Sequence, residues 1–151
     1  MADPTQLYPI FSGRARHALD AKNRTTIPVG WRPEKPTPLW IVPQSDSSCL
    51  LAMPEGEFRA VPVRVNALTQ LDAEERQDFI DIFMSEAEQV TPDAQGRFVI
   101  PPRFCEKLGL RGEVVLSGAD AKFKIWKPED FERFLTDRLS RARTVGKQAQ
   151  V

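Results

Sequence analysis

The chain has 151 residues, of which 41% are hydrophobic and 28% are charged, the ordinary composition of a soluble globular protein. This length suits one compact domain or two small units that share a core. The 21 basic and 21 acidic residues leave no net charge. That balance argues against a protein that coats nucleic acid non-specifically, because phosphate neutralisation requires an excess of Lys and Arg.

Membrane association and secretion are both disfavoured. No apolar run approaches the roughly 20 residues of a membrane span, and the N-terminal sequence lacks the basic segment and apolar core of a signal peptide. Cys49 and Cys105 are isolated and His17 is the single histidine, so no spacing typical of a metal site is present. We expect a cytoplasmic protein with two free thiols, no metal and no cofactor.

The first distinctive segment, residues 12–32, has a local charge of +4 within a neutral chain. Arg14 and Arg16 alternate along a strand-like stretch, so their side chains share one face. Lys22 and Arg24 follow across a tight turn. This arrangement suits phosphate contact and the reading of base edges, although a solvated hairpin with ordinary surface arginines fits this segment alone equally well.

The turn itself has a clear local signature. Asp20 can bond the backbone two residues further on, and Asn23 tolerates a positive φ, so D-A-K-N predicts a tight turn. The next residues, R-T-T-I, alternate as a half-buried strand does, and Pro28 ends that strand.

The rest of the first half, which we take as one unit over residues 11–70, is less regular. Residues 39–42 and 49–53 predict two strands. A helix should follow Pro54, but Pro62 interrupts it, so we expect this helix to be short or kinked.

Residues 71–90 predict an acidic connecting helix. Asp72 and Glu75 have the spacing of a capping box at its start. Its expected apolar face comprises Phe79, Ile80, Phe83 and Met84. Residues 72–93 hold eight acids and one base, so we do not expect this connector to touch DNA.

An internal repeat is the most informative feature. Residues 93–101 match residues 20–28 without gaps at an offset of 73, with five of nine positions identical. Gly96 stands where the first copy has Asn23, which again predicts a turn with positive φ. The offset is close to half the chain and predicts duplication of one unit. The Asp and Arg four residues apart in each copy could also simply brace the turn.

Two further blocks agree between the halves. Trp31 and Phe104 each follow the motif's Pro by three residues, and residues 53–58 resemble residues 127–131 with one residue added in the first copy. Chance is a poor explanation of three separate matches.

The second unit, residues 91–139, is more regular than the first. Residues 102–108 predict a short helix closed by Gly109, and residues 113–117 and 122–126 predict strands. The inward residues expected on these strands are Val115, Phe123 and Ile125. Pro128 should open a last helix, and residues 140–151 are expected to form a flexible tail.

These motifs resemble one known family. The F-S-G at residues 11–13, the paired D-x-x-x-R-x-x-I-P motifs and the K-I-W-K-P-E-D-F block are similar to those of the MraZ family, over residues 11–139. Its members belong to the bacterial division and cell-wall gene cluster and contain two SpoVT-AbrB-like units.

The resemblance implies an α+β fold in which two pseudo-symmetric swapped-hairpin AbrB-like units form a β-barrel core with flanking helices. It also implies a sequence-specific, nucleoid-associated regulator that binds promoter-proximal direct repeats of double-stranded DNA as a ring-shaped homo-oligomer. The family's DNA-contacting turn falls on Asp20, Lys22 and Arg24, and its second motif on Asp93 and Arg97. We expect DNA contacts from basic residues and turn geometry from the others. The expected DNA-binding residues are Arg14, Arg16, Lys22, Arg24 and Arg97, and the expected turn residues are Asp20, Asn23, Asp93 and Gly96.

Two other functions fit the sequence less well. Catalysis needs several titratable groups that converge on one site. We expect His17 to be a surface residue and both cysteines to lie in the core, so we expect no catalytic residues. The stronger alternative is an AbrB-type antitoxin, or a regulator that binds another protein through the acidic helix. A second unit occupies the place of an antitoxin's disordered tail, which disfavours that alternative.

Overall fold

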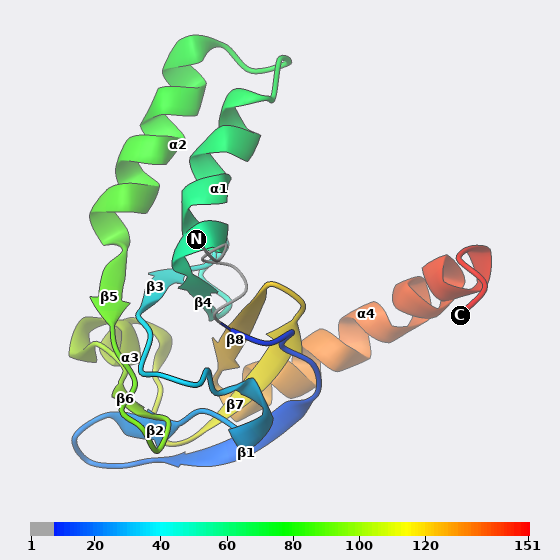
Figure 1. The fold of residues 1–151 in the computed structure, drawn as a ribbon. Helices are drawn as coiled ribbons and strands as arrows, with labels where there is room; N and C mark the ends of the chain where they lie inside the picture. The colour runs from blue at the N-terminus through cyan, green and yellow to red at the C-terminus, as the bar shows by residue number, and fades with distance from the viewer. Residues whose placement is uncertain (1–7) are drawn as a thin grey trace.

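A computed structural model describes residues 8–151. The expectation that the N-terminus is not a signal peptide falls mostly on residues outside this range. Within them the chain is a mixed α+β protein with antiparallel sheets and four α-helices, as expected (Figure 1). The strands are β1 (Arg14–Leu19), β2 (Arg24–Thr26), β3 (Leu39–Pro43), β4 (Leu50–Pro54), β5 (Glu88–Val90), β6 (Arg97–Val99), β7 (Gly112–Ala119) and β8 (Lys122–Trp126). The helices are α1 (Glu55–Asn66), α2 (Ala73–Glu86), α3 (Pro102–Leu108) and α4 (Pro128–Gln148), with a 3-10 helix over Val29–Trp31.

Six strands form one sheet in the order β1-β7-β8-β4-β3-β5, and β2 pairs with β6 in a separate two-stranded sheet. The larger sheet has open edges at β1 and β5, so the strand pairing in the described part of the chain does not close into the expected barrel.

The outer strands are exchanged between the two halves of the chain. β1 precedes the first turn but pairs with β7 of the second half, and β5 precedes the second turn but pairs with β3 of the first half. The two hairpins, β3–β4 and β7–β8, meet where β4 pairs with β8. In the internal repeat β1 corresponds to β5, β3 to β7 and β4 to β8. When each strand is replaced by its counterpart, the strand order is the same from either edge of the sheet.

Two hydrophobic layers cover opposite faces of this sheet. Phe123 and Ile125 are fully buried in the main core, which also receives Phe98 from the β2–β6 sheet. Val115 and Trp126 are buried on the other face, under α4. The expectation that Val115 shares a face with Phe123 was therefore wrong, because the register of β7 against β8 pairs Val115 with Trp126.

The connecting helix begins as predicted. The Asp72 carboxylate accepts from the Glu75 backbone N–H at 2.8 Å, and the Glu75 carboxylate accepts from the Asp72 N–H at 3.3 Å, which completes a capping box. The segment does not stay helical to residue 90, because its end forms β5. The helix after Pro54 was expected to be short or kinked, and α1 is not short, because it has twelve residues and includes Pro62. Its buried Phe58 stacks on Trp40 and Phe83, and this packing against β3 and α2 outweighs the lost hydrogen bond.

The predicted flexible tail is instead the second half of α4, which continues to Gln148. Figure 1 shows that α4 and the α1–α2 hairpin both project from the sheet, in different directions. Among the helices of residues 8–151, none has the length and apolar character needed to cross a membrane.

Candidate nucleic-acid interface

The first D-x-x-x-R turn is held by one carboxylate. Asp20 Oδ1 accepts from the backbone N–H groups of Lys22 at 2.9 Å and Arg24 at 2.8 Å, and Asp20 Oδ2 accepts from Arg24 Nε at 2.8 Å. The turn is closed by a backbone hydrogen bond in which the Asn23 N–H donates to the Asp20 carbonyl at 2.9 Å. A carboxylate at the first position thus satisfies the backbone donors of the turn and orients the arginine.

The second turn repeats this geometry. Asp93 Oδ1 accepts from the backbone N–H groups of Gln95 and Arg97, both at 2.9 Å, and Asp93 Oδ2 accepts from Arg97 Nε at 2.8 Å. The Gly96 N–H bonds to the Asp93 carbonyl at 2.9 Å. The reading in which Asp and Arg brace the turn is therefore correct for both copies, and it also holds each arginine in one orientation.

Asn23 and Gly96 both have positive φ, of 62° and 81°. Their surroundings differ, because a Cβ on Gly96 would lie 2.5 Å from Arg32 Nε. Arg32 is held there by its bond from Nε to the Ile27 carbonyl at 3.0 Å. The second turn therefore requires glycine, whereas the first accommodates an asparagine.

The two turns lie at opposite ends of one short ladder, because β2 and β6 pair directly and antiparallel. Arg24 lies opposite Val99, and Arg97 lies opposite Thr26. Side chains alternate across a strand, so these four share the outer face, and both arginines are exposed. Thr25 and Phe98 face the core and are buried. Two arginines 73 positions apart in the chain thus occupy diagonal positions on one small exposed surface.

The ion pairs with Asp20 and Asp93 leave the terminal nitrogens of Arg24 and Arg97 available to an external hydrogen-bond acceptor. The backbone N–H and side chain of Arg24 lower the pKa of Asp20 below its usual value, and those of Arg97 do the same for Asp93. Both carboxylates are therefore ionised at neutral pH. Within the described part of the chain only the Nε of each arginine side chain is engaged, and the side chains of Arg24 and Arg97 remain 51% and 59% exposed.

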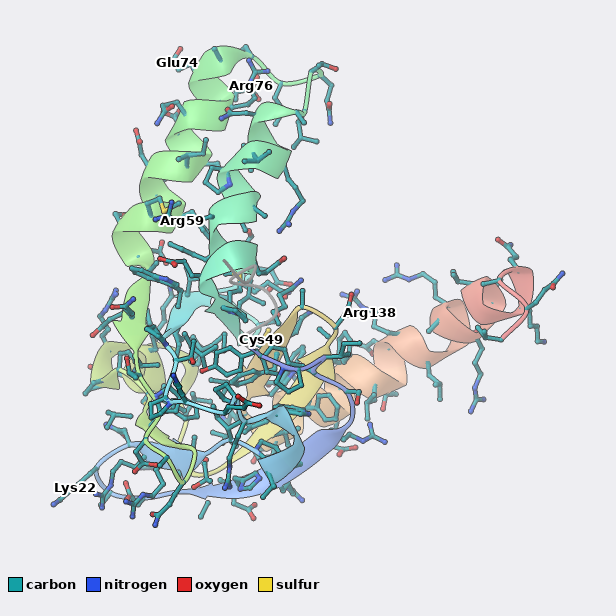
Figure 2. The ribbon with its side chains drawn as sticks, viewed as in Figure 1. Lys22, Cys49, Arg59, Glu74, Arg76 and Arg138 are labelled. Atoms are coloured by element: carbon teal, nitrogen blue, oxygen red, sulfur yellow. The ribbon has the colours of Figure 1, made fainter. Side chains whose placement is uncertain are left out.

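The remaining candidate residues lie at the tip of the first turn and along β1. Lys22 is exposed at the tip of the first turn and lies at the outer edge of the molecule (Figure 2). Arg16 Nε lies 3.8 Å from Glu113 Oε2, and this carboxylate partly neutralises the positive charge of the arginine. Arg14 is at the far end of β1, roughly 17 Å along the strand from Leu19. Its guanidinium lies over the ring of Phe131 of α4, at 5.5 Å from the centroid.

A hollow of about 940 Å³ lies beside the first turn, but its charge is mixed. Its basic and acidic lining residues are Arg16, Glu106, Arg111, Glu113, Lys127 and Glu129. An anion would meet as many carboxylates as cations there, so the β2–β6 surface is the stronger candidate site. Sequence reasoning identified its arginines but not the neighbouring Thr26 and Val99, because the repeat alignment does not indicate that the two copies pair with each other.

Comparison with known proteins identifies the class. A curated relative from Syntrophobacter fumaroxidans is 33% identical over 127 residues, covering 82% of this chain and 83% of its own length. One from a Parafrankia species is 32% identical over 136 residues, covering 85% and 89%. One from Clostridium acetobutylicum is 30% identical over 125 residues, covering 83% and 87%. All three are named "Transcriptional regulator MraZ".

Residues 83–149 also match a family model described as "MraZ protein, putative antitoxin-like". The chain is thus of the transcriptional-regulator class, which implies regulation through DNA binding and is non-enzymatic. It belongs to the MraZ family, which confirms the resemblance found in its motifs.

Proposed function

We propose that this protein is a sequence-specific DNA-binding regulator of its own division and cell-wall gene cluster, located at the nucleoid. In this proposal it binds promoter-proximal direct repeats of double-stranded DNA as a ring-shaped homo-oligomer. The observation that supports the proposal most directly is the pair of identically braced arginines, Arg24 and Arg97, on one exposed face.

We assign base reading to these two arginines. A guanidinium held through Nε keeps its terminal nitrogens for the O6 and N7 acceptors of guanine, and ordering the side chain in advance lowers the cost of binding. Thr26 and Val99 occupy the other diagonal of the same face, and their methyl groups suit contact with a thymine methyl.

We assign phosphate contacts to Lys22, Arg14 and Arg16. Lys22 projects from the turn tip, where a flexible ammonium can reach a backbone oxygen. Arg14 and Arg16 lie on the α4 face of the six-stranded sheet, where they pair with Ser117 and Val115, and each already has a neighbour in the chain, Phe131 and Glu113 respectively. They would therefore add affinity but little sequence selectivity.

The finer fold assignment belongs to the same proposal. The exchanged outer strands and the palindromic sheet order support two swapped-hairpin AbrB-like units that arose by duplication. Such a chain presents, within one molecule, the twofold surface that two separate units would otherwise have to form by dimerisation.

The test is a titration of the purified protein against the DNA upstream of its own gene, with a scrambled duplex of equal length as control. We expect the upstream repeats to be bound at least tenfold more tightly at physiological salt. Equal binding of both duplexes would contradict sequence-specific regulation.

The family model's description also supports the antitoxin alternative. Co-purification from the native host separates the two functions. A stable one-to-one complex with a second protein, formed by chains that fail to bind the upstream repeats, would favour the antitoxin over the regulator.

A further inference from the structure

The distal part of α4 has no structural partner among residues 8–151. From residue 139 to residue 148 every residue except Gly146 is exposed, while Phe131, two turns earlier, is buried against the sheet. Figure 1 shows this part of the helix extending away from the sheet. A helical segment of this length is marginal on its own in water, so we expect an external surface to stabilise it.

Its side chains indicate what that surface is. Leu135, Leu139, Ala142 and Val145 follow helical spacing and continue the buried stripe of Phe131 into solvent. Residues 138–148 carry four positive charges and no acid. The basic residues are Arg138, Arg141, Arg143 and Lys147. An apolar stripe bordered by cations fits a protein surface with an apolar centre and acidic borders.

α2 offers that surface. It holds five acids and one arginine, which give it a net charge of −4. Phe79 and Ile82 are 37% and 59% exposed on it, beside a hollow of about 180 Å³ that they line with Phe83 and Val42. Asp78 and Asp81 flank these apolar residues and are exposed.

The two surfaces of one chain cannot meet in this fold. Figure 2 places Glu74, near the tip of the α1–α2 hairpin, far from Arg138 on α4, and the two elements project in different directions. We therefore propose that the distal half of α4 of one copy docks on α2 of a second copy. This inference rests on the proposed self-assembly and specifies its contact. Because the two surfaces differ, the contact is head-to-tail and can propagate around a closed ring.

DNA is the other polyanion that four cations could bind. Two observations favour the protein partner: the apolar stripe between the cations, and the direction of α4, which leads away from Lys22 and the turn surface (Figure 2). Phosphate contact would need neither apolar residues nor helical register.

A complementary charge reversal tests the contact. One variant carries Arg141→Glu with Arg143→Glu, and the other carries Asp78→Lys with Asp81→Lys, all at exposed positions. The substitutions cancel the net charge of +4 on distal α4 in the first variant and of −4 on α2 in the second. Each variant alone should therefore show a dissociation constant for self-association, measured by sedimentation, at least tenfold higher than that of the unchanged protein. An equimolar mixture should reassemble in alternation, because each unchanged α4 then meets an unchanged α2, and each substituted α4 meets a substituted α2 with opposite charges at the exchanged positions.

Arg133→Glu is the matched control, since Arg133 is 69% exposed on the proximal half of the same helix, and it should assemble normally. Circular dichroism checks that each variant is folded. As a second measurement, copies with Ile82→Cys mixed with copies carrying Leu139→Cys should form a disulfide-linked dimer on oxidation.

The outcomes separate this contact from the proposed function. If the unchanged protein assembles and both reversal variants assemble equally well, or if the mixture stays dissociated, the α4–α2 contact is wrong while DNA-binding regulation stands. If the unchanged protein is a monomer that still binds the upstream repeats, the assembly proposal fails. If reversal on α4 abolishes DNA binding but leaves assembly unchanged, α4 is a DNA-binding arm and the docking proposal is overturned.

Discussion

Thr25 and Phe98 lie directly opposite each other in the β2–β6 ladder, and they are also equivalent positions of the internal repeat. A pair of equivalent residues that face each other must lie on the axis that relates the two copies. The flanking bonds obey the same symmetry, since the Ile27 N–H donates to the Gly96 carbonyl and the Ile100 N–H to the Asn23 carbonyl, both at 2.8 Å. The chain therefore contains a local twofold axis at its candidate DNA surface.

We predict that Arg24→Ala weakens specific DNA binding more than Arg97→Ala. Both arginines are braced alike, but Arg24 has Lys22 beside it, whereas Arg97 has Gln95. Loss of a base-reading arginine typically costs about 1–3 kcal/mol of discrimination. Titrations of both variants on the upstream repeats at two salt concentrations measure this difference. Binding by Arg24→Ala that matches the unchanged protein would remove the turn surface as the DNA site.

We predict that Lys22→Ala acts differently from either arginine variant. A phosphate contact carries no sequence information, so affinity for specific and scrambled DNA should fall by a similar factor. The slope of log affinity against log salt should become shallower by about 1. A selective loss of the specific complex would show that Lys22 reads bases instead.

We predict that the Asp20→Asn, Asp93→Asn double variant has a lower melting temperature at neutral pH. Both carboxyl groups have folded-state pKa values below their unfolded value of about 3.9. Groups of this kind stabilise the fold above the unfolded pKa, and the contribution is lost as the pH falls through the folded pKa. The difference in melting temperature between the double variant and the unchanged protein should therefore have its full size at pH 7 and become smaller below about pH 4. A difference that is unchanged at low pH would exclude ionised carboxylates as its cause.

We predict that Gly96→Ala destabilises the fold by about 1–2 kcal/mol, because the residue has positive φ and its Cβ would meet Arg32. Asn23→Gly is the matched change in the other copy and should be neutral or slightly stabilising, since glycine adopts that conformation without strain. Urea unfolding of both variants checks the contrast. Combining Gly96→Ala with Arg32→Ala should recover only part of the loss, because the strain in φ persists.

We predict that neither cysteine reacts in the folded protein. Burial raises the pKa of the Cys49 thiol to about 11 and also raises that of Cys105. A thiol alkylating agent at pH 8 should therefore modify both only after denaturation. Rapid labelling of the native protein at Cys49 would show that the core around β4 opens.

Local chemistry allowed the sequence alone to predict much of this protein. Each D-x-x-x-R turn is held by bonds within five residues, so Asp20 and Asn23 were enough to predict it. The capping box at Asp72, the left-handed Gly109 after α3 and the strand at residues 122–126 are equally local, and the structure confirms them. The repeat, the family and the regulatory class also follow from residue order.

Only the tertiary structure determined how the two copies combine. No local rule states that β1 pairs with β7, that β5 pairs with β3, or that Arg24 and Arg97 share a face. Continuation of α1 through Pro62 depends on the stacking of Phe58 between Trp40 and Phe83, which come from other elements. These features depend on contacts between residues far apart in the chain, whose free energy comes from burying surfaces that are not neighbours in the sequence.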